Sequence, residues 1–210
     1  MILKNKFIKL LIIFFIGIID LQSQISGLDI LNKVEKNIFE IKNAYYSFKV
    51  ESDTESDIFP IFGEYFFEKG RYFIKTDQID QLYDGFFFYT IVHENKEIIK
   101  NSDESYFLNL IPNQILKRLS KDFSIEIDDI DTFSYYLNAK NTTNSNLLFK
   151  VKVNKENFSI EKIDLIDSNN FLVNSFLTIS YNFNLKLNPS LFKFDLNKYP
   201  NYFIIENWKS

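Results

Sequence analysis

The sequence predicts a mainly β fold with added helices, built as one antiparallel sheet of about eleven strands. Three observations lead to this prediction. Aromatic and β-branched residues, which pack well on a pleated sheet, crowd the stretch from Phe62 to His93. The turn pairs Lys69-Gly70 and Asp84-Gly85 interrupt that stretch at hairpin spacing. Helical spacing of apolar residues is confined to two places, from Ser26 to Asn43 and from Ile111 to Lys121.

Both helical segments are amphipathic. In the first, apolar residues recur at steps of three and four, namely Leu31, Val34, Ile38 and Ile41. Ser26 or Asp29 is suited to cap its start. The second is short and carries Pro112 in its first turn, where the missing N–H costs nothing. A helix with one apolar stripe must bury it, so the first helix is expected to lie against the sheet.

The strands are predicted from runs of alternating or β-branched residues between turn residues. No linker between them marks a second domain. The expected strands are Tyr45 to Glu51, Ile61 to Glu68, Arg71 to Thr76, Ile79 to Tyr83, Phe86 to Val92, Glu97 to Lys100, Phe123 to Ile130, Thr132 to Ala139, Leu147 to Val153, Phe158 to Ile166 and Leu172 to Leu185.

The strand from Phe86 to Val92 is apolar on both faces. A sheet with one wet face should carry a polar residue at every second position, so this strand needs a cover on each side. One face could pack on a helix while the other lines an enclosed ligand space. The alternative is a core strand of a sandwich that has no cavity.

The amino-terminal residues predict export. Lys4, Lys6 and Lys9 precede ten apolar residues from Leu10 to Ile19, and a polar stretch follows. This is the pattern of a secretory signal peptide, expected over residues 1–23, with a single domain over residues 24–210. Ten residues are too few to span a membrane, which takes about 20 in a helix. An uncleaved anchor stays open as an alternative, because Leu21 is large for a residue before the cleavage site.

Composition argues against several functions. The net charge of −4 gives no reason to expect nucleic-acid binding. The absence of Cys excludes disulfides, zinc–thiolate sites, a thiol nucleophile and attachment of a lipid to an N-terminal Cys. The lone His93 makes neither a metal cluster nor a triad, and no G-x-S-x-G motif occurs. We therefore expect no catalytic residue, no metal site, no cofactor and no enzyme activity.

Several short patterns occur in a particular order. An amphipathic helix precedes a strand with Gly63, Phe66, Phe67 and Lys69, and Phe73 follows. Asp84-Gly85 then leads into FFFY, a helical insert comes before the second group of strands, and the chain closes with NPSLFKFDLNKYP. This order resembles the bacterial outer-membrane lipoprotein carrier protein family, the LolA type, from about Leu31 to Glu206. Family members often carry an Arg where this chain has Lys69. A Lys side chain cannot form the paired, bidentate hydrogen bonds that an Arg guanidinium can form.

The resemblance implies an open antiparallel half-barrel, covered by the N-terminal helix and a short helical lid. It implies a periplasmic, monomeric carrier that shields lipoprotein acyl chains in an apolar cavity between the inner and outer membranes. Its partners would be acylated lipoproteins, an inner-membrane lipoprotein-releasing transporter and an outer-membrane acceptor that the sequence does not name. Two alternatives remain: an envelope lipid-binding module of the same fold without lipoprotein cargo, and a purely structural module.

The resemblance and the apolar pattern together select candidate site residues. Lys69 is the candidate for the mouth or latch of the cavity. The expected cavity wall comprises Leu31, Val34, Ile38, Phe48, Phe66, Phe73, Leu82, Phe88, Tyr89, Ile91, Ile115 and Leu119.

Overall fold

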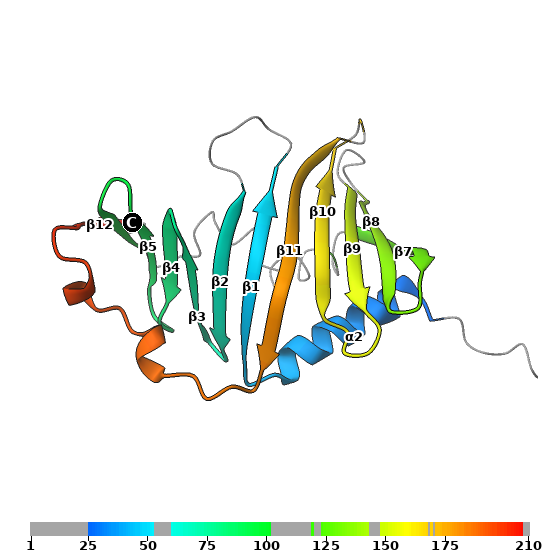
Figure 1. Ribbon diagram of the computed structural model, residues 1–210, viewed down its shortest axis with the longest axis horizontal. Helices are drawn as coiled ribbons and strands as arrows, with labels where there is room; N and C mark the ends of the chain where they lie inside the picture. The colour runs from blue at the N-terminus through cyan, green and yellow to red at the C-terminus, as the bar shows by residue number, and fades with distance from the viewer. Residues whose placement is uncertain are drawn as a thin grey trace, which may run out of the picture.

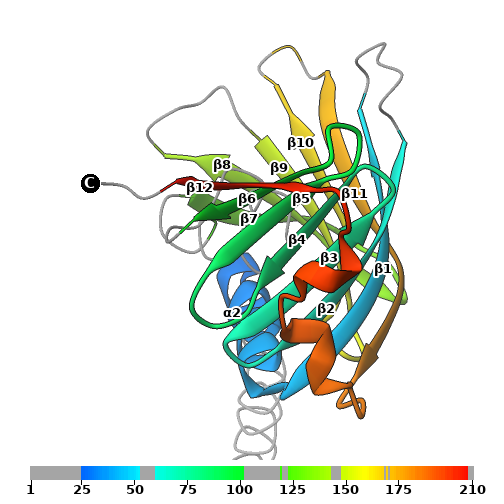
Figure 2. The same cartoon turned by 90° about the vertical axis from the view of Figure 1, so that its left-hand side faces the viewer.

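The computed structural model describes residues 25–52, 60–101, 119, 123–142, 148–167, 169 and 171–207. One curved sheet of twelve strands dominates it, and the sheet stays open because its two end strands do not pair (Figures 1 and 2). The strands are β1 (Asn43–Glu51), β2 (Ile61–Glu68), β3 (Arg71–Thr76), β4 (Ile79–Tyr83), β5 (Phe88–Val92), β6 (Glu97–Asn101), β7 (Phe123–Ile130), β8 (Ser134–Asn141), β9 (Leu148–Asn154), β10 (Ile160–Ile166), β11 (Leu172–Phe183) and β12 (Phe203–Asn207). The expected mainly β, open half-barrel architecture is confirmed.

The sheet consists of two antiparallel meanders joined side by side. Its order is β12-β6-β5-β4-β3-β2-β1-β11-β10-β9-β8-β7, so β1 to β6 form one half and β7 to β11 the other. β12 was not expected, and it pairs parallel to β6, with Phe203 beside Glu97 and Asn207 beside Asn101. The sheet is therefore not antiparallel throughout. A strand that pairs in parallel leaves no hairpin turn in the sequence, which is why β12 escaped prediction.

Helix α2 (Gly27–Glu40) begins at a reciprocal cap. The backbone N–H of Asp29 donates to Ser26 Oγ at 3.1 Å, and the N–H of Ser26 donates to Asp29 Oδ2 at 3.0 Å. The Ser26 hydroxyl also donates to Asp29 Oδ2 at 2.7 Å, and this bond, followed by that from the Ser26 N–H, lowers the pKa of the Asp29 carboxyl. The apolar stripe faces the sheet, since Ile30, Leu31 and Val34 are fully buried. Both expected caps are thus used together.

The two faces of the sheet each carry an apolar cluster. We call the face that α2 covers the inner face, and the opposite one the outer face (Figure 2). The larger, inner cluster joins α2 to residues of both meanders. The smaller, outer cluster consists of Leu82, Tyr89, Ile91 and Ile98, and residues after η2 (Pro189–Phe192) pack on it. Strand β5 therefore contributes side chains to both clusters, with Tyr89 and Ile91 buried in the outer one and Phe88 packed against the inner one.

The turn before β5 differs from expectation. Gly85 has a φ of +103°, but Asp84 does not share a positive φ, so the loop is not a two-residue type I′ turn, in which both central residues need a positive φ. Asp84 Oδ1 instead accepts hydrogen bonds from the N–H groups of Phe86 at 2.8 Å and Phe87 at 2.9 Å. This Asx arrangement lengthens the loop, so the strand starts at Phe88 and Phe86 is exposed.

Two expectations fall wholly or mainly outside the described residues. The signal peptide over residues 1–23 lies outside them and stays a prediction. The helical lid from Ile111 to Lys121 also lies outside them, except for Leu119. Among the helices that are described, none is long and apolar enough to cross a membrane.

Candidate apolar binding site

A row of aromatic side chains crosses the inner face from β2 to β5. It consists of Phe67, Tyr72, Tyr83 and Phe88, which are direct cross-strand neighbours. The rings of Tyr72 and Tyr83 lie 5.8 Å apart, and those of Tyr83 and Phe88 stack at 4.2 Å. All four side chains are only half-buried. We call these four residues the inner aromatic row.

A second row runs parallel to it on the outer face. Phe66 stacks on Phe73 at 6.3 Å, and Phe73 pairs with Leu82, which pairs with Tyr89. Because successive residues of a strand point to opposite faces, the side chains of this row lie on the face opposite to α2. Ile91 belongs to the same outer cluster. Five residues expected in one cavity wall therefore lie on the face opposite to Phe88, and the sheet itself separates them from it.

The remaining candidates divide into three groups. Leu31, Val34, Phe48 and Leu119 are buried members of the inner cluster, and Phe88 packs against it. The side chain of Ile38 and the whole of Ile115 lie outside the described part of the chain. Lys69 is exposed in the β2–β3 turn, where its N–H donates to the carbonyl of Lys42 at 3.2 Å. The latch role of Lys69 stays a prediction.

Gly63 lets one inner aromatic ring lie against the sheet. Phe48 and Gly63 are partners in neighbouring strands, and a Cβ on Gly63 would lie 2.3 Å from Cζ of Phe48. The Phe48 ring therefore occupies the space that any other side chain would fill. It also stacks on Phe176 of β11 at 5.2 Å, which links the two meanders on the inner face.

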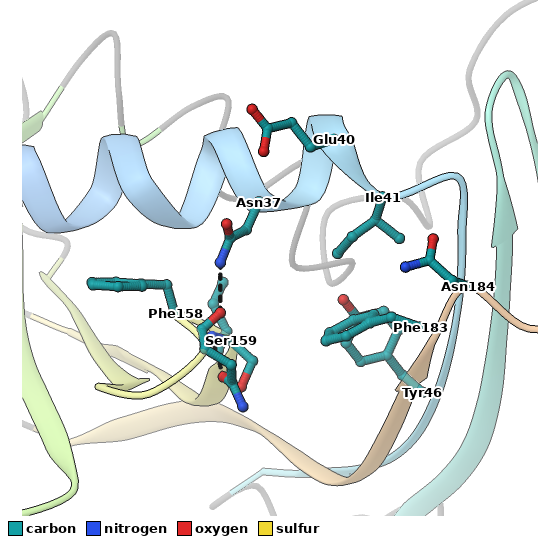
Figure 3. Close-up of a pocket in the computed structure, with 10 residues that line it drawn as sticks. Asn37, Glu40, Ile41, Tyr46, Phe158, Ser159, Phe183 and Asn184 are labelled. Carbon is teal, nitrogen blue, oxygen red and sulfur yellow. Dashed lines mark hydrogen bonds between the residues drawn. The ribbon is translucent and has the colours of Figure 1, made fainter.

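A cavity of about 330 Å³ opens at one end of the inner face, beside the last turn of α2 (Figure 3). Strand β1, the end of β11 and the β9–β10 turn form its other sides. Its apolar walls include Ile41, Tyr46 and Phe183, and the rings of Tyr46 and Phe183 meet edge to face at 6.0 Å. Tyr46 also stacks on Tyr65 at 5.9 Å. Tyr65 in turn contacts Tyr72, so the cavity adjoins the inner aromatic row.

Phe158 forms another wall of the cavity from an unusual backbone conformation. Its φ is +51°, a region that bulky residues rarely adopt. The turn is held by Asn154, whose carbonyl accepts from the Phe158 N–H at 3.0 Å. The Phe158 ring stacks near Tyr135, and the Lys33 ammonium lies 5.0 Å from its centroid. A turn that holds a phenyl ring in this conformation places that ring under α2.

Burial favours the uncharged form of two inner tyrosines, Tyr46 and Tyr65. It raises the pKa of Tyr65 well above its ordinary value, and burial followed by the nearby Tyr181 raises that of Tyr46. In the part of the chain that the structure describes, no group of three or more His, Asp or Glu side chains is placed to hold a metal ion. The arrangement suits apolar contact and hydrogen bonding from neutral groups.

Sequence reasoning missed several of these residues. Tyr46 had a usable signal, since β1 alternates strictly, with Ala44, Tyr46, Phe48 and Val50 all buried. Tyr72 and Tyr83 could be assigned to the inner face only once the register against β2 and β5 was known. Ser159 lines the cavity because the β9–β10 turn folds beneath the helix, and no local pattern marks it.

His93 has a structural position on the outer face. Its Nε2 lies 3.3 Å from Asp80 Oδ1, and its Nδ1 lies 3.1 Å from the hydroxyl of Tyr202. It therefore ties the β4–β5 hairpin to the chain that leads into β12. Burial raises the pKa of the Asp80 carboxyl, against the opposing effect of His93.

Comparison with known proteins identifies the fold. No family model matches the chain. None of the curated proteins matches its sequence either. An uncharacterized conserved protein from Thermus thermophilus has a similar structure, with a TM-score of 0.60 and 7% identity over 85% of this chain and 98% of that one. This likeness shows a common fold over most of both chains.

Two further solved structures are more distant. A LolA superfamily protein from Nitrosomonas europaea aligns with a TM-score of 0.39 and 13% identity, over 80% of this chain and 97% of its own. The Mycobacterium tuberculosis lipoprotein LppX aligns with a TM-score of 0.46 and 8% identity, over 77% and 96%.

Proposed function

We propose that this protein is a periplasmic carrier that shields the acyl chains of lipoproteins on its inner face. The observation that carries the proposal is the inner aromatic row, whose four rings are neighbours yet stay half-buried beside a cavity. Half-buried rings retain apolar surface that a ligand can cover. Burying an acyl chain contributes about 0.8 kcal/mol per CH₂ before costs, so even partial cover stabilises a complex.

The neutrality of the inner face supports an apolar ligand. Burial raises the pKa of Tyr46 and Tyr65 and so favours their uncharged forms, and aliphatic residues of α2 belong to the same cluster. Binding there needs no catalytic group. Release requires two states of the protein that differ by only a few kcal/mol. Among the described elements, α2 is the helix that covers this face, and a helical cover allows such a change more readily than a second sheet.

The first test replaces Phe88 by Glu on the inner face. The carboxylate would have to be desolvated beside an acyl chain, so uptake of a fluorescent fatty-acid probe should fall at least tenfold. The fold should survive at a cost of about 1–2 kcal/mol, because a half-buried position lets water reach the charge. Probe titration and urea unfolding measure the two effects.

Phe66→Glu is the matched control, because Phe66 is also half-buried but lies on the outer face. It should bind the probe like the unmodified protein. The proposal is overturned if the unmodified protein takes up no probe, if Phe66→Glu rather than Phe88→Glu loses binding, or if Phe88→Glu unfolds. The last result would favour a packed, purely structural core.

The cargo needs a separate experiment. Mass spectrometry of lipids and proteins that co-purify with the chain from the cell envelope should find acylated lipoproteins and an inner-membrane lipoprotein-releasing transporter. Envelope lipids without lipoproteins would favour the alternative, a lipid-binding module of the same fold. Intact mass after fractionation also tests export, since the proposal requires a chain cleaved near Ser23 in the periplasmic fraction.

A further inference from the structure

The cavity beside α2 contains a buried hydroxyl group that lacks a partner among the described residues. Ser159 lines the cavity and is 7% exposed, and its Oγ makes no hydrogen bond to any described residue. Tyr46 lines the same cavity and is 8% exposed. Buried polar groups are normally paired, so an unpaired hydroxyl in the wall of a cavity points to a ligand that supplies the missing partner.

The surrounding amides are already arranged around this space. Asn37 Nδ2 donates to the carbonyl of Asn157 at 2.6 Å, as Figure 3 shows, and this bond fixes the Asn37 side chain on the helix side of the cavity. Asn157 Oδ1 accepts from the N–H of Ser159 at 2.8 Å, which fixes the turn that carries the serine. The Asn184 amide stands at the opposite side. A ligand therefore meets amide oxygens and amide N–H groups as well as hydroxyls.

The cavity is electrically neutral over the residues that the structure describes. The single charged residue among the described lining residues is Glu40, which is exposed and lies 3.6 Å from the ammonium of Lys36. No described Lys or Arg side chain lines the cavity to balance a phosphate or a carboxylate. An anionic group there would be desolvated without a partner charge, whereas neutral hydroxyls find both donors and acceptors.

We propose that this cavity binds the neutral, hydroxyl-bearing head group of an acyl lipid, and that the ligand class is an acylglycerol rather than a free fatty acid. The proposal rests on the proposed function, because the acyl chain would leave the cavity past Tyr46 and Tyr65 and continue along the inner aromatic row. Ser159 and Tyr46 then donate to or accept from the glycerol hydroxyls.

The test compares three ligands with the same acyl chain, all below their critical micelle concentrations. They are a monoacylglycerol, the fatty-acid methyl ester, which is neutral but has no hydroxyl, and the ionised fatty acid. Calorimetric titration of the full chain should find the monoacylglycerol bound about tenfold more tightly than the ester, and the fatty acid bound most weakly. Equal affinities for the monoacylglycerol and the ester would overturn the inference.

Ser159→Ala tests the hydroxyl directly. It should weaken monoacylglycerol binding about fivefold to tenfold and leave the methyl ester unchanged, and Tyr46→Phe should act in the same direction. Ser159→Ala should not lower the thermal midpoint of the free protein, since Ser159 Oγ makes no hydrogen bond within the described chain. A loss that is the same for both ligands would instead show a general effect on the apolar site, which contradicts the proposal.

Ser175→Ala is the matched control. Ser175 is also buried, with an Oγ that has no partner in the described chain, but it does not line the cavity. Monoacylglycerol binding by this variant should equal that of the unmodified protein. The two proposals fail differently: if no ligand binds, the carrier function falls, and if all three bind equally, only the head-group inference falls.

Discussion

The two faces of the sheet bury apolar residues to very different extents. On the outer face, Ile91 and Ile98 are completely buried. On the inner face, Tyr83 and Phe88 of the same hairpin remain half-buried, although they stack on each other. One strand, β5, thus contributes to a sealed cluster on one side and to a partly open surface on the other. Apolar content alone therefore does not identify a binding surface. What matters is whether another part of the chain already covers the apolar side chains.

The cover of the outer face comes from the carboxyl-terminal part of the chain. Phe194 stacks on Tyr89 at 4.2 Å with nearly parallel rings. Phe192 is 1% exposed and lies under Arg71, whose guanidinium carbon is 5.1 Å from the ring centroid. Together with the contact between His93 and Tyr202, these residues fasten residues 189–207 across the hairpin (Figure 2). We call residues 189–207 the carboxyl-terminal strap.

The largest effect is expected for Ile91→Glu. This change places a carboxylate in the sealed outer cluster, beside the apolar side chains of Leu82 and Ile98, and it should cost at least about 3–5 kcal/mol. A domain of ordinary stability would then be largely unfolded. Circular dichroism with urea titration measures the loss. If Ile91→Glu is no less stable than Phe88→Glu, the contrast between the two faces is wrong.

A smaller effect is expected for Phe194→Ala. Loss of its stack on Tyr89 should destabilise the protein by about 2 kcal/mol and loosen the carboxyl-terminal strap. Hydrogen exchange should therefore quicken in β12 more than in β1, while binding of the fatty-acid probe stays unchanged. The control is Leu196→Ala, an exposed position on the same strap, with an effect within about 0.5 kcal/mol. Uniform loss of protection in both strands would contradict a separate outer cover.

The smallest effect concerns Asp80, a carboxylate beneath the carboxyl-terminal strap. Because burial raises its pKa above 3.8 in the folded state, the folded protein favours the protonated form. The stability linked to this group is therefore complete at pH values below 3.8 and is lost as the pH rises through the folded value. Asp80→Asn should raise the thermal midpoint by about 1–3 °C at pH 7 and bring no gain below pH 3.8.

Thermal melts of both proteins at the two pH values test this prediction, with Asp77→Asn as an exposed control in the neighbouring turn. A gain of the same size at both pH values would show that ionisation of Asp80 is not its cause. A lower midpoint at pH 7 would show that the negative charge beside His93 is required to hold the carboxyl-terminal strap.

Much of the fold could be predicted from the sequence. The bounds of β2, β3, β4 and β7 agree with prediction to the residue. Their ends coincide with turn residues such as Gly70, whose φ is +82°, and these conformations are set by the local sequence. The start of α2 was predictable for the same reason, because Ser26 and Asp29 cap it through neighbouring backbone groups.

The candidate site was harder to predict, because it depends on which face of each strand meets the helix. Strand β5 is apolar at Phe88, Tyr89 and Ile91, so its pattern fits either orientation, and a shift of one residue exchanges the faces. Only the pairing of β2 with β3 shows that Phe66 lies on the outer face and Phe67 on the inner face. The position of Ser159 in the cavity depends on a contact between segments far apart in the sequence. In this contact Asn37 of α2 donates a hydrogen bond to the β9–β10 turn.

The pairing of β1 with β11 has a consequence for how the protein is made. This pairing places Ala44 beside Phe183 and Tyr46 beside Tyr181. Strand β1 therefore has a partner on both edges only after β11 has been made. Contacts between such distant segments close slowly, because the intervening chain must be ordered first. A chain that emerges amino end first from a ribosome or a membrane pore therefore exposes one edge of β1 during most of its passage. An unpaired edge of this kind favours association with other chains, so slow emergence should select for a chaperone that binds it.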